Sequence, residues 1–326
     1  MALPYGRGLS SKHEANRGGR VGVEPIPSWP GELIEAGDAR LHVRSTPAGP
    51  GETAVFVHGL AGSATNWTDL MGELATDVRG YAVDLPGAGY SPEPPDGDYS
   101  VDGHVNAVAG LIERVGGPVH LFGNSMGGAI SVRVAATRPD LVRSLTLISP
   151  ALPDLLPRFG PARVAMSAAP RLGELAVRKL NGVPVGRRVQ ATLSWCYADG
   201  SRVHPQRLRE AEEELRRRDG LPYAAAAMVG CARAIVNEYF RVGPGNLWRQ
   251  AAKVTAPTLV IYGRRDRLVD SRMAVRAGRA FPNVRLVTLA HAAHVAQMEF
   301  PEAVAREARR LIAETAAPRL SAVRTA

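Results

Sequence analysis

Short apolar runs and amphipathic stretches alternate along most of this sequence, and that alternation restricts the possible folds more than any other feature. The runs are rich in β-branched residues, as in Thr53–Val57, and are too short for helices. Stretches with apolar residues at helical intervals lie between them, such as Val101–Val115, which ends at Gly116-Gly117. This alternation predicts a mostly parallel sheet with helices on both faces. The expected strands are Arg40–Ser45, Thr53–Val57, Tyr81–Val83, Val119–Phe122, Ser144–Ile148, Thr258–Tyr262 and Val284–Leu289, and the expected helices are Asn66–Ala75, Val101–Val115, Gly127–Thr137, Ser271–Ala280 and one from about Pro301.

The alternation is interrupted once, after Ser149-Pro150, and strand character returns only at Thr258. The intervening residues are rich in Ala and Arg and show helical stretches and turn residues but no convincing strand. Residues 1–30 are rich in Gly, Arg, Pro and Ser and have no apolar period. We therefore expect one α/β domain with an insertion: a mobile N-terminal arm at 1–30, the core at 31–149 and 251–316, a helical cap at 150–250 and a C-terminal tail at 317–326.

The composition argues against several other classes of protein. The chain has 326 residues, of which 45% are hydrophobic and 22% charged, as in globular proteins. Its two cysteines, Cys196 and Cys231, have no histidine at metal-binding spacing, so we expect neither a disulfide scaffold nor a metal site. The first twenty residues lack the apolar core of a signal peptide, and no stretch has the pattern of a membrane span, so we expect a cytoplasmic protein.

The charge distribution bears on possible partners. The formal net charge is +9, and residues 151–250 contain 16 Lys or Arg against 9 Asp or Glu. The basic residues are not grouped with aromatic ones in a short stripe, so we expect no nucleic-acid partner. Arg171–Leu180 combines basic and apolar residues, which leaves contact with an anionic membrane surface as an alternative. Solvated or paired arginine side chains are the simpler interpretation, and we favour it.

The most informative motif is Gly123-Asn124-Ser125-Met126-Gly127, a G-x-S-x-G sequence between an expected strand and an expected helix. Glycines two positions before and after Ser125 permit a tight turn that lifts the hydroxyl clear of the sheet. The N-terminus of the following helix favours negative charge that develops there. The motif therefore indicates a nucleophilic serine, and a structural turn with an inert serine is the alternative.

Three further segments, together with this motif, make the sequence similar to the α/β-hydrolase superfamily and to its cap-containing esterase and lipase branch. His58–Ser63 (HGLAGS) resembles the family's oxyanion loop, and Asp84–Ser91 (DLPGAGYS) resembles its turn after the next strand. His294, with Glu299 and Pro301 downstream, resembles its catalytic histidine segment. The segments occur in the family's order across about residues 32–316. The resemblance implies an α/β-hydrolase fold whose cap is inserted after the sixth strand.

The general base that a serine nucleophile needs is expected at His294. His291 lies three residues earlier and is the alternative, but only His294 stands at the family's distance from Glu299. His58 and His120 lie beside expected strands and are more simply packed, hydrogen-bonded histidines. No resemblance supports a role for His104, on an expected helix.

The acid that orients the imidazole is expected at Asp266, because the family places it after the seventh strand. The chain order Ser125, Asp266, His294 is that of the family. Asp154, after the sixth strand, is one alternative. Asp270 is another, although an N-cap of the next helix is its simpler role.

An oxyanion hole is implied by the same resemblance. Its donors would be the backbone N–H groups of Leu60, in the loop from His58, and of Met126, which follows the nucleophile. The alternative is that His58-Gly59-Leu60 is only a tight strand exit. Because the donors are backbone groups, simple side-chain replacement does not remove them.

The resemblance implies hydrolysis of a carboxylic ester through an acyl-serine intermediate, with no cofactor. Ser125 would attack, His294 would take and return the proton, and Asp266 would hold the ring. A serine in place of aspartate argues against the haloalkane dehalogenase and epoxide hydrolase branches. The sequence GNSMGG at Gly123–Gly128 also resembles C–C bond hydrolases, which remain second because the loop at His58 lacks their Gly-Pro-Gly stretch. Other acyl hydrolases or transferases share the triad, and a non-catalytic small-molecule receptor is the alternative of another class.

The expected substrate is a small-molecule ester, and its apolar acyl group would lie under the insertion. Most aromatic and methionine side chains of the insertion are expected to form its own core. Those that are candidates for the pocket wall are Phe159, Met166, Trp195, Tyr197, Met228, Tyr239 and Phe240.

Overall fold

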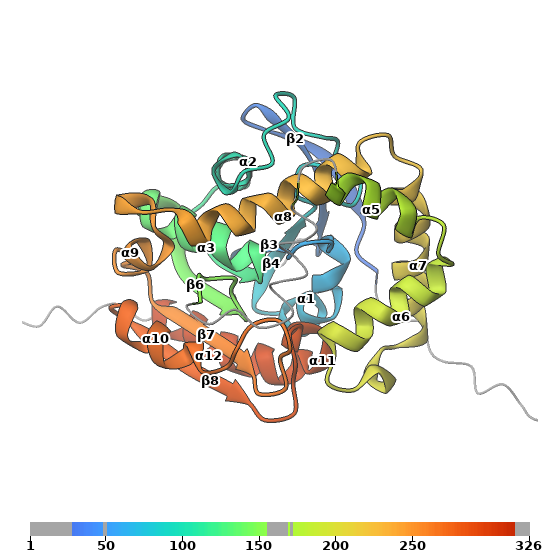
Figure 1. Cartoon of the computed structure of the whole chain (residues 1–326). Helices are drawn as coiled ribbons and strands as arrows, with labels where there is room; N and C mark the ends of the chain where they lie inside the picture. Colours follow the sequence, from blue (N-terminus) through green and yellow to red (C-terminus); the bar gives the residue numbers. More distant parts are fainter. Residues whose placement is uncertain (1–27, 48–50, 155–168, 170–171, 317–326) are drawn as a thin grey trace, which may run out of the picture.

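An eight-stranded sheet forms the centre of the computed structural model, which describes residues 28–47, 51–154, 169 and 172–316 (Figure 1). The strands are β1 (Gly31–Ala36), β2 (Ala39–Ser45), β3 (Glu52–Val57), β4 (Val78–Val83), β5 (Val119–Asn124), β6 (Val142–Ile148), β7 (Thr258–Gly263) and β8 (Val284–Leu289). Their order in the sheet is β1-β2-β4-β3-β5-β6-β7-β8. The β1–β2 and β2–β4 pairs are antiparallel, and all the others are parallel.

Helices cover both faces of the sheet, and each face has its own hydrophobic core. The helices around the sheet are α1 (Thr68–Leu74), α2 (Val101–Arg114), α3 (Met126–Thr137), α9 (Leu247–Ala251), α10 (Met273–Ala280), α11 (Ala296–Glu299) and α12 (Pro301–Ala316). One core is formed with α1, α11 and α12, and the other with α2, α3, α9 and α10. Neighbouring residues of a strand point to opposite faces, so Val55 enters one core and Phe56 the other.

The parallel register brings the carboxyl ends of six strands, β3 to β8, to one edge of the sheet. Val57 lies opposite Gly123, and Asn124 lies opposite Ile148, so β3, β5 and β6 end side by side. β7 and β8 end together in the same way. Loops that leave this edge are where open α/β sheets bind ligands, and they contain the expected site residues.

Between β6 and β7 in the chain, the described residues form α9 and, before it, four helices that we call the cap helices: α5 (Leu172–Leu180), α6 (Val185–Cys196), α7 (Pro205–Asp219) and α8 (Ala224–Phe240). In Figure 1, α5, α6 and α7 group on the right of the view, and α8 runs from this group toward α9. A buried ion pair joins α8 to the core, because Arg133 of α3 donates to Glu238 of α8 at 2.6 Å.

The fold class is confirmed, and so are the seven expected strands and the five expected helices, with differences of up to three residues at their ends. The sequence pattern did not single out β1 as a strand. It is an edge strand whose residues are mostly exposed, including Leu33 at 46%, so it has no buried apolar run.

The chain ends are described only in part. Of the expected N-terminal arm, residues 1–27 lie outside the described residues, as does the tail at 317–326. Residues 28–30 are held against the core, because Trp29 Nε1 donates to Thr68 O at 3.0 Å and Ser45 N donates to Pro30 O at 3.1 Å. None of the described helices is long and apolar enough to cross a membrane.

Candidate active site

Ser125 lies at a strained turn between β5 and α3. Its φ of 55° and ψ of −118° are unusual for a residue that has a side chain. The N–H of Ser125 donates to Ile148 O at 3.1 Å, which fixes the turn against β6. The glycines of the motif are required because α3 approaches the sheet closely. A Cβ at Gly127 would lie 2.2 Å from Val57 O, and one at Gly123 would lie 2.5 Å from Gly127 O.

Asp266 and His294 are brought together at the same edge of the sheet. His294 Nδ1 lies 2.9 Å from Asp266 Oδ2, and both residues are buried. Because a carboxylate only accepts hydrogen bonds, Nδ1 carries the proton and Nε2 is available as a base. Ser125 and His294 line one cavity, although no hydrogen bond joins them among the described residues. Looser spacing of nucleophile and base is common in unliganded enzymes.

The environment of Asp266 favours its ionised form. Burial alone would raise the pKa of this carboxyl group. The neighbouring His294, with its hydrogen bond, and the N–H groups of Val269 and Leu268 lower the pKa below its usual value instead. Those two N–H groups donate to Oδ1 at 2.9 and 2.8 Å. Asp266 can therefore stabilise a positive charge on the imidazole.

Asn124 holds the loop of His294, and the sequence did not predict this role. Its Nδ2 donates to His294 O and to Ile148 O, both at 3.0 Å. The side chain thus ties the histidine loop to β6, next to the nucleophile. Asn124 occupies a variable position of the G-x-S-x-G motif, so the motif itself carries no signal for it.

Glu299 ties the same loop to the end of α6. Its Oε2 accepts from Ala293 N at 2.6 Å, and its Oε1 accepts from Ala198 N at 2.8 Å. His294 N also donates to Cys196 O at 3.0 Å. The spacing of Glu299 from His294 marked it as part of the family's segment, but not as a link to the cap helices.

Two N–H groups beside Ser125 have no acceptor among the described residues, namely those of Leu60 and Met126. The Leu60 loop touches the nucleophile, since a Cβ at Gly59 would lie 2.9 Å from Ser125 Cβ. Met126 is the first residue of α3, where N–H groups lack partners within the helix. Both expected donors are therefore free to bind an oxygen atom.

The other histidines that were considered from the sequence contact different groups. His58 is buried and accepts from Leu85 N at 3.0 Å through Nε2, so its Nδ1 donates to Gly59 O at 2.7 Å. His120 contacts Ser144 and Glu52 at 2.8 Å each, and burial lowers its pKa. His104 is also buried, which lowers its pKa to about 4. His291 is exposed.

The alternative acids occupy different positions. Asp270 Oδ1 accepts from Arg272 N at 3.0 Å, and Oδ2 pairs with the Arg272 side chain at 2.6 Å. The expectation that Asp270 is a helix N-cap is wrong, because α10 begins at Met273 with Arg272 as its N-cap. Asp154 lines the cavity, but the carboxylate bonded to His294 is that of Asp266.

A cavity of about 300 Å³ lies over Ser125 between the core and the cap helices. Val189, Leu193, Leu215 and Ile235 form much of its apolar wall. Of the pocket residues expected from the sequence, Tyr197 and Tyr239 line it, whereas Trp195, Met228 and Phe240 do not, and Phe159 and Met166 lie outside the described residues. Within the described part of the chain, no group of three or more acidic, histidine or cysteine side chains could hold a metal ion.

Comparison with known proteins shows where this arrangement occurs. The model of the alpha/beta hydrolase fold family matches residues 54–301, which include every residue of the site described above. The chain belongs to this family. A strained serine turn at the carboxyl edge of a parallel sheet is common to many of its members.

Proteins similar to this chain have names that specify different reactions. A 2-hydroxy-6-oxononadienedioate/2-hydroxy-6-oxononatrienedioate hydrolase of Cupriavidus pinatubonensis is 27% identical over 84% of this chain and 91% of its own length. A pimeloyl-[acyl-carrier protein] methyl ester esterase of Aeromonas salmonicida is 24% identical over 78% of this chain and 92% of its own. The solved structure of the haloalkane dehalogenase DbeA from Bradyrhizobium elkani has a TM-score of 0.73 at 20% identity, covering 88% and 99% of the two chains. This likeness shows the fold alone.

Proposed function

We propose that this protein is a serine hydrolase that cleaves small carboxylic esters through an acyl-serine intermediate. The observation that carries the proposal is the contact of His294 with Asp266 at the cavity that Ser125 also lines. A buried acidic partner fixes the imidazole tautomer, so that Nε2 can accept a proton. The strained backbone of Ser125 favours the same role, because such strain persists where function requires it.

The proposed reaction begins when Ser125 Oγ attacks the ester carbonyl carbon while His294 Nε2 accepts the hydroxyl proton. Negative charge moves to the carbonyl oxygen, which would accept from the free N–H groups of Leu60 and Met126. The alcohol leaves with the proton from His294. Water then attacks the acyl-serine by the same route, which releases the acid and regenerates Ser125.

The cavity supports an apolar acyl group as the substrate's main feature. Its described wall contains Val189, Leu193, Leu215 and Ile235, all from the cap helices. We propose that the cap helices select the substrate, whereas the core supplies the chemistry. Apolar walls with a few convergent polar groups are typical of small-molecule sites.

The proposal is tested by 4-nitrophenyl esters from acetyl to long acyl chains, together with a fluorophosphonate probe that labels activated serines. The full-length protein should hydrolyse part of the series and become labelled, whereas Ser125→Ala should do neither while it keeps the wild-type circular dichroism spectrum. Turnover by Ser125→Ala at a rate near that of the wild type would overturn the mechanism. A wild-type protein that binds small molecules but neither reacts nor hydrolyses would instead be a receptor.

C–C bond hydrolysis is the second candidate function. It is supported by the Cupriavidus pinatubonensis relative, whose name specifies a hydrolase of 2-hydroxy-6-oxononadienedioate, and by the GNSMGG sequence at Gly123–Gly128. The two candidates differ in the bond cleaved, not in the triad. A value of kcat/KM for a 2-hydroxy-6-oxodienoate at least about tenfold above the value for the best ester would reverse their order, because specificity is the ratio of these values.

A further inference from the structure

Helix α7 of the cap contacts the loops at the catalytic edge through residues at helical spacing. Arg217 donates to Gly89 O through Nη1, and its guanidinium lies 4.0 Å from the centre of the Tyr90 ring. Arg218 donates to Ala61 O at 3.3 Å. Residues three and four apart share one face of a helix, so these contacts and those of Glu214 come from a single face.

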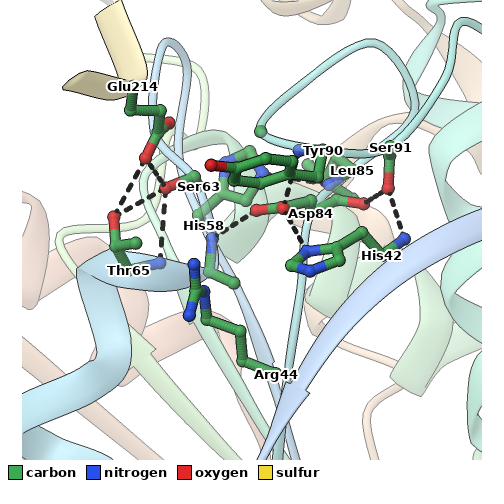
Figure 2. A network of polar contacts seen from close by, with 12 residues as sticks. His42, Arg44, His58, Ser63, Thr65, Asp84, Leu85, Tyr90, Ser91 and Glu214 are labelled. Atoms are coloured by element: carbon green, nitrogen blue, oxygen red, sulfur yellow. Dashed lines mark hydrogen bonds and ion pairs between the residues drawn. The ribbon is translucent and has the colours of Figure 1, made fainter. Parts of the chain in front are cut away.

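Glu214 contacts Ser63 and Thr65, which follow the loop at His58 (Figure 2). Its Oε2 accepts from Ser63 Oγ at 2.6 Å and from Thr65 Oγ1 at 3.2 Å, and its side chain lines the cavity over Ser125. This carboxylate forms no ion pair among the described residues, although the charge of the neighbouring Arg218 acts to lower its pKa. Burial raises the pKa of Glu214, which means that the ionised carboxyl group is destabilised at this position. A carboxyl group without a role at the site would not be expected there.

Ser63 connects Glu214 to the expected oxyanion donor. The turn that carries Leu60 is closed by a hydrogen bond from Gly62 N to Gly59 O at 3.1 Å, and Ser63 follows it directly. Ser63 also caps the short helix at Ala64–Trp67, because its Oγ accepts from Thr65 N at 3.3 Å. The hydroxyl that binds Glu214 is thus fixed at the end of the turn.

The core holds the same turn from the other side. His58 Nδ1 donates to Gly59 O at 2.7 Å, and Asp84 Oδ1 accepts from Ala64 N at 2.6 Å. Figure 2 shows this arrangement, in which Asp84 and His58 lie on one side of Ser63 and Glu214 on the other. The oxyanion loop is therefore held between a core carboxylate and a cap carboxylate.

We propose that Glu214 is a positioning residue, through which the position of the cap helices on the core determines the geometry of the oxyanion hole. The inference rests on the proposed function, because the oxyanion hole has no use without it. Through Ser63, Glu214 sets the position of the Leu60 N–H, and it need not touch the reacting atoms. The cap helices then complete the catalytic site in addition to covering it.

The inference predicts an effect on kcat rather than on KM. Oxyanion donors act on charge that develops only in the transition state, so a displaced Leu60 N–H slows the chemical step and leaves substrate binding nearly unchanged. Loss of one such donor costs about 10²- to 10³-fold in kcat. A loosened loop retains part of that contribution, so we expect a loss of about 10- to 100-fold for Glu214→Ala, below that upper limit.

Substitutions at Glu214, with a control at Glu213, distinguish the effect of the position of the carboxyl group from the effect of its charge. Glu214→Asp keeps the charge but withdraws the carboxylate from Ser63, and we expect it to lose about as much kcat as Glu214→Ala. Glu214→Gln keeps the length and an accepting oxygen, so it should restore kcat to within about fivefold of wild type. Glu213→Ala is the matched control, because this exposed neighbour on α7 should leave kcat and KM unchanged.

Two measurements exclude a merely structural role. Affinity for a boronic acid, which forms a tetrahedral adduct with an activated serine, should fall in parallel with kcat across the variants. In addition, Glu214→Ala should cost little further kcat once Ser63→Ala is present, because the two side chains act through one contact. Should Glu214→Ala fail to fold, Glu214→Asp and Glu214→Gln still test the inference.

Some outcomes would overturn the inference. A rise in KM with unchanged kcat would show that Glu214 acts only as part of the cavity wall, and wild-type kinetics in Glu214→Asp would show that its position is unimportant. In both cases fluorophosphonate labelling of Ser125 would remain, so the proposed function would stand. A wild-type protein that is not labelled would overturn the proposed function and this inference together.

Discussion

The core and the cap helices contribute side chains to one cavity, but they hold them in different ways. In the core, Ser125 and Asp266 follow the ends of parallel strands, and hydrogen bonds of the backbone fix where those strands end. On the cap side, Glu214 and Arg218 reach the site through side-chain contacts with loops. A backbone ladder does not depend on any one side chain, whereas the cap contacts do. We therefore expect substitutions of the core site residues to abolish catalysis, and substitutions in the cap helices to change kcat by smaller factors.

The largest expected effect distinguishes the two histidines near the end of β8. His294→Ala should lower kcat for the best ester by about 10⁴- to 10⁶-fold, because triad members act as a unit. His291→Ala is the matched control, and its exposed side chain should leave kcat within about twofold of wild type, as is usual for surface positions. Steady-state kinetics at neutral pH measure both. A larger loss in His291→Ala would transfer the role of base to that residue.

The next effect tests which carboxylate orients His294. Asp266→Asn should reduce kcat by about 10³- to 10⁴-fold, because an amide at this position favours the wrong imidazole tautomer. Asp154→Asn is the comparison, since Asp154 also lines the cavity but the bond to His294 comes from Asp266. We expect Asp154→Asn to stay within about tenfold of wild type, as for a contact that only lines the pocket. If the larger loss came from Asp154, the acid would lie after β6.

The same contrast explains how much of the molecule the sequence could predict. The expected strands could be predicted from apolar periodicity and Ser125 from the G-x-S-x-G motif, because both are local signals. Asp266 and His294 were predicted from the resemblance to the family's segments. The roles of Asn124 and Glu214 could not be predicted from the sequence, because their partners lie 170 and 151 residues away. Those partners are a backbone carbonyl and a hydroxyl group, which leave no recognisable sequence pattern.

The cap side of the pocket was predicted less well than the core for a related reason. The composition of the insertion identified its aromatic residues, but it does not fix which helix face meets the cavity. Tyr197 lines the cavity, whereas Phe240 is 77% exposed. Helices have no backbone hydrogen bonds to neighbouring elements of the kind that fix how strands pair. The orientation of each cap helix therefore depends on side-chain packing with segments distant in the sequence.

An intermediate effect concerns the joint between the two regions. Arg133 of α3 donates to Glu238 of α8, and both side chains are 3% exposed. Removal of Arg133 leaves the buried Glu238 with the partly exposed Arg241 as its remaining ion-pair partner. Arg133→Met should therefore lower the free energy of unfolding by up to about 3–5 kcal/mol, the cost of a buried charge that has lost its partner entirely. Urea titration followed by circular dichroism measures this loss.

Arg138→Met is the control for that experiment. Arg138 pairs with Glu113 and Asp140 at the surface, where ion pairs contribute little, so its removal should scarcely move the urea midpoint. Equal destabilisation by both variants would mean that the joint between α3 and α8 is no stronger than a surface pair. Esterase activity of folded Arg133→Met at low temperature should stay close to wild type, because the pair lies outside the cavity lining.

The smallest expected effect compares Asp84 and Glu214, the two carboxyl groups that flank the loop at His58–Ser63, by the pH dependence of the melting temperature. Burial acts to raise the pKa of Asp84, but the hydrogen bond with His42, the neighbouring His58 and the N–H groups of Ala64 and Tyr90 lower it below its usual value. The stability that Asp84 contributes is therefore present above its unfolded pKa of about 3.9 and is lost as the pH falls through the lower folded value.

Glu214 should show the opposite dependence. Burial raises its pKa and outweighs the hydrogen bond from Ser63, so its ionisation costs stability as the pH rises from the unfolded pKa of about 4.3 through the higher folded value. Compared with wild type, Glu214→Gln should thus gain melting temperature as the pH is raised from 4 to 7, and Asp84→Asn should lose less as it is lowered from 5 to 3. Parallel curves for wild type and Glu214→Gln would show that Glu214 has the same pKa folded and unfolded, and that burial does not outweigh the hydrogen bonds and the charge of Arg218.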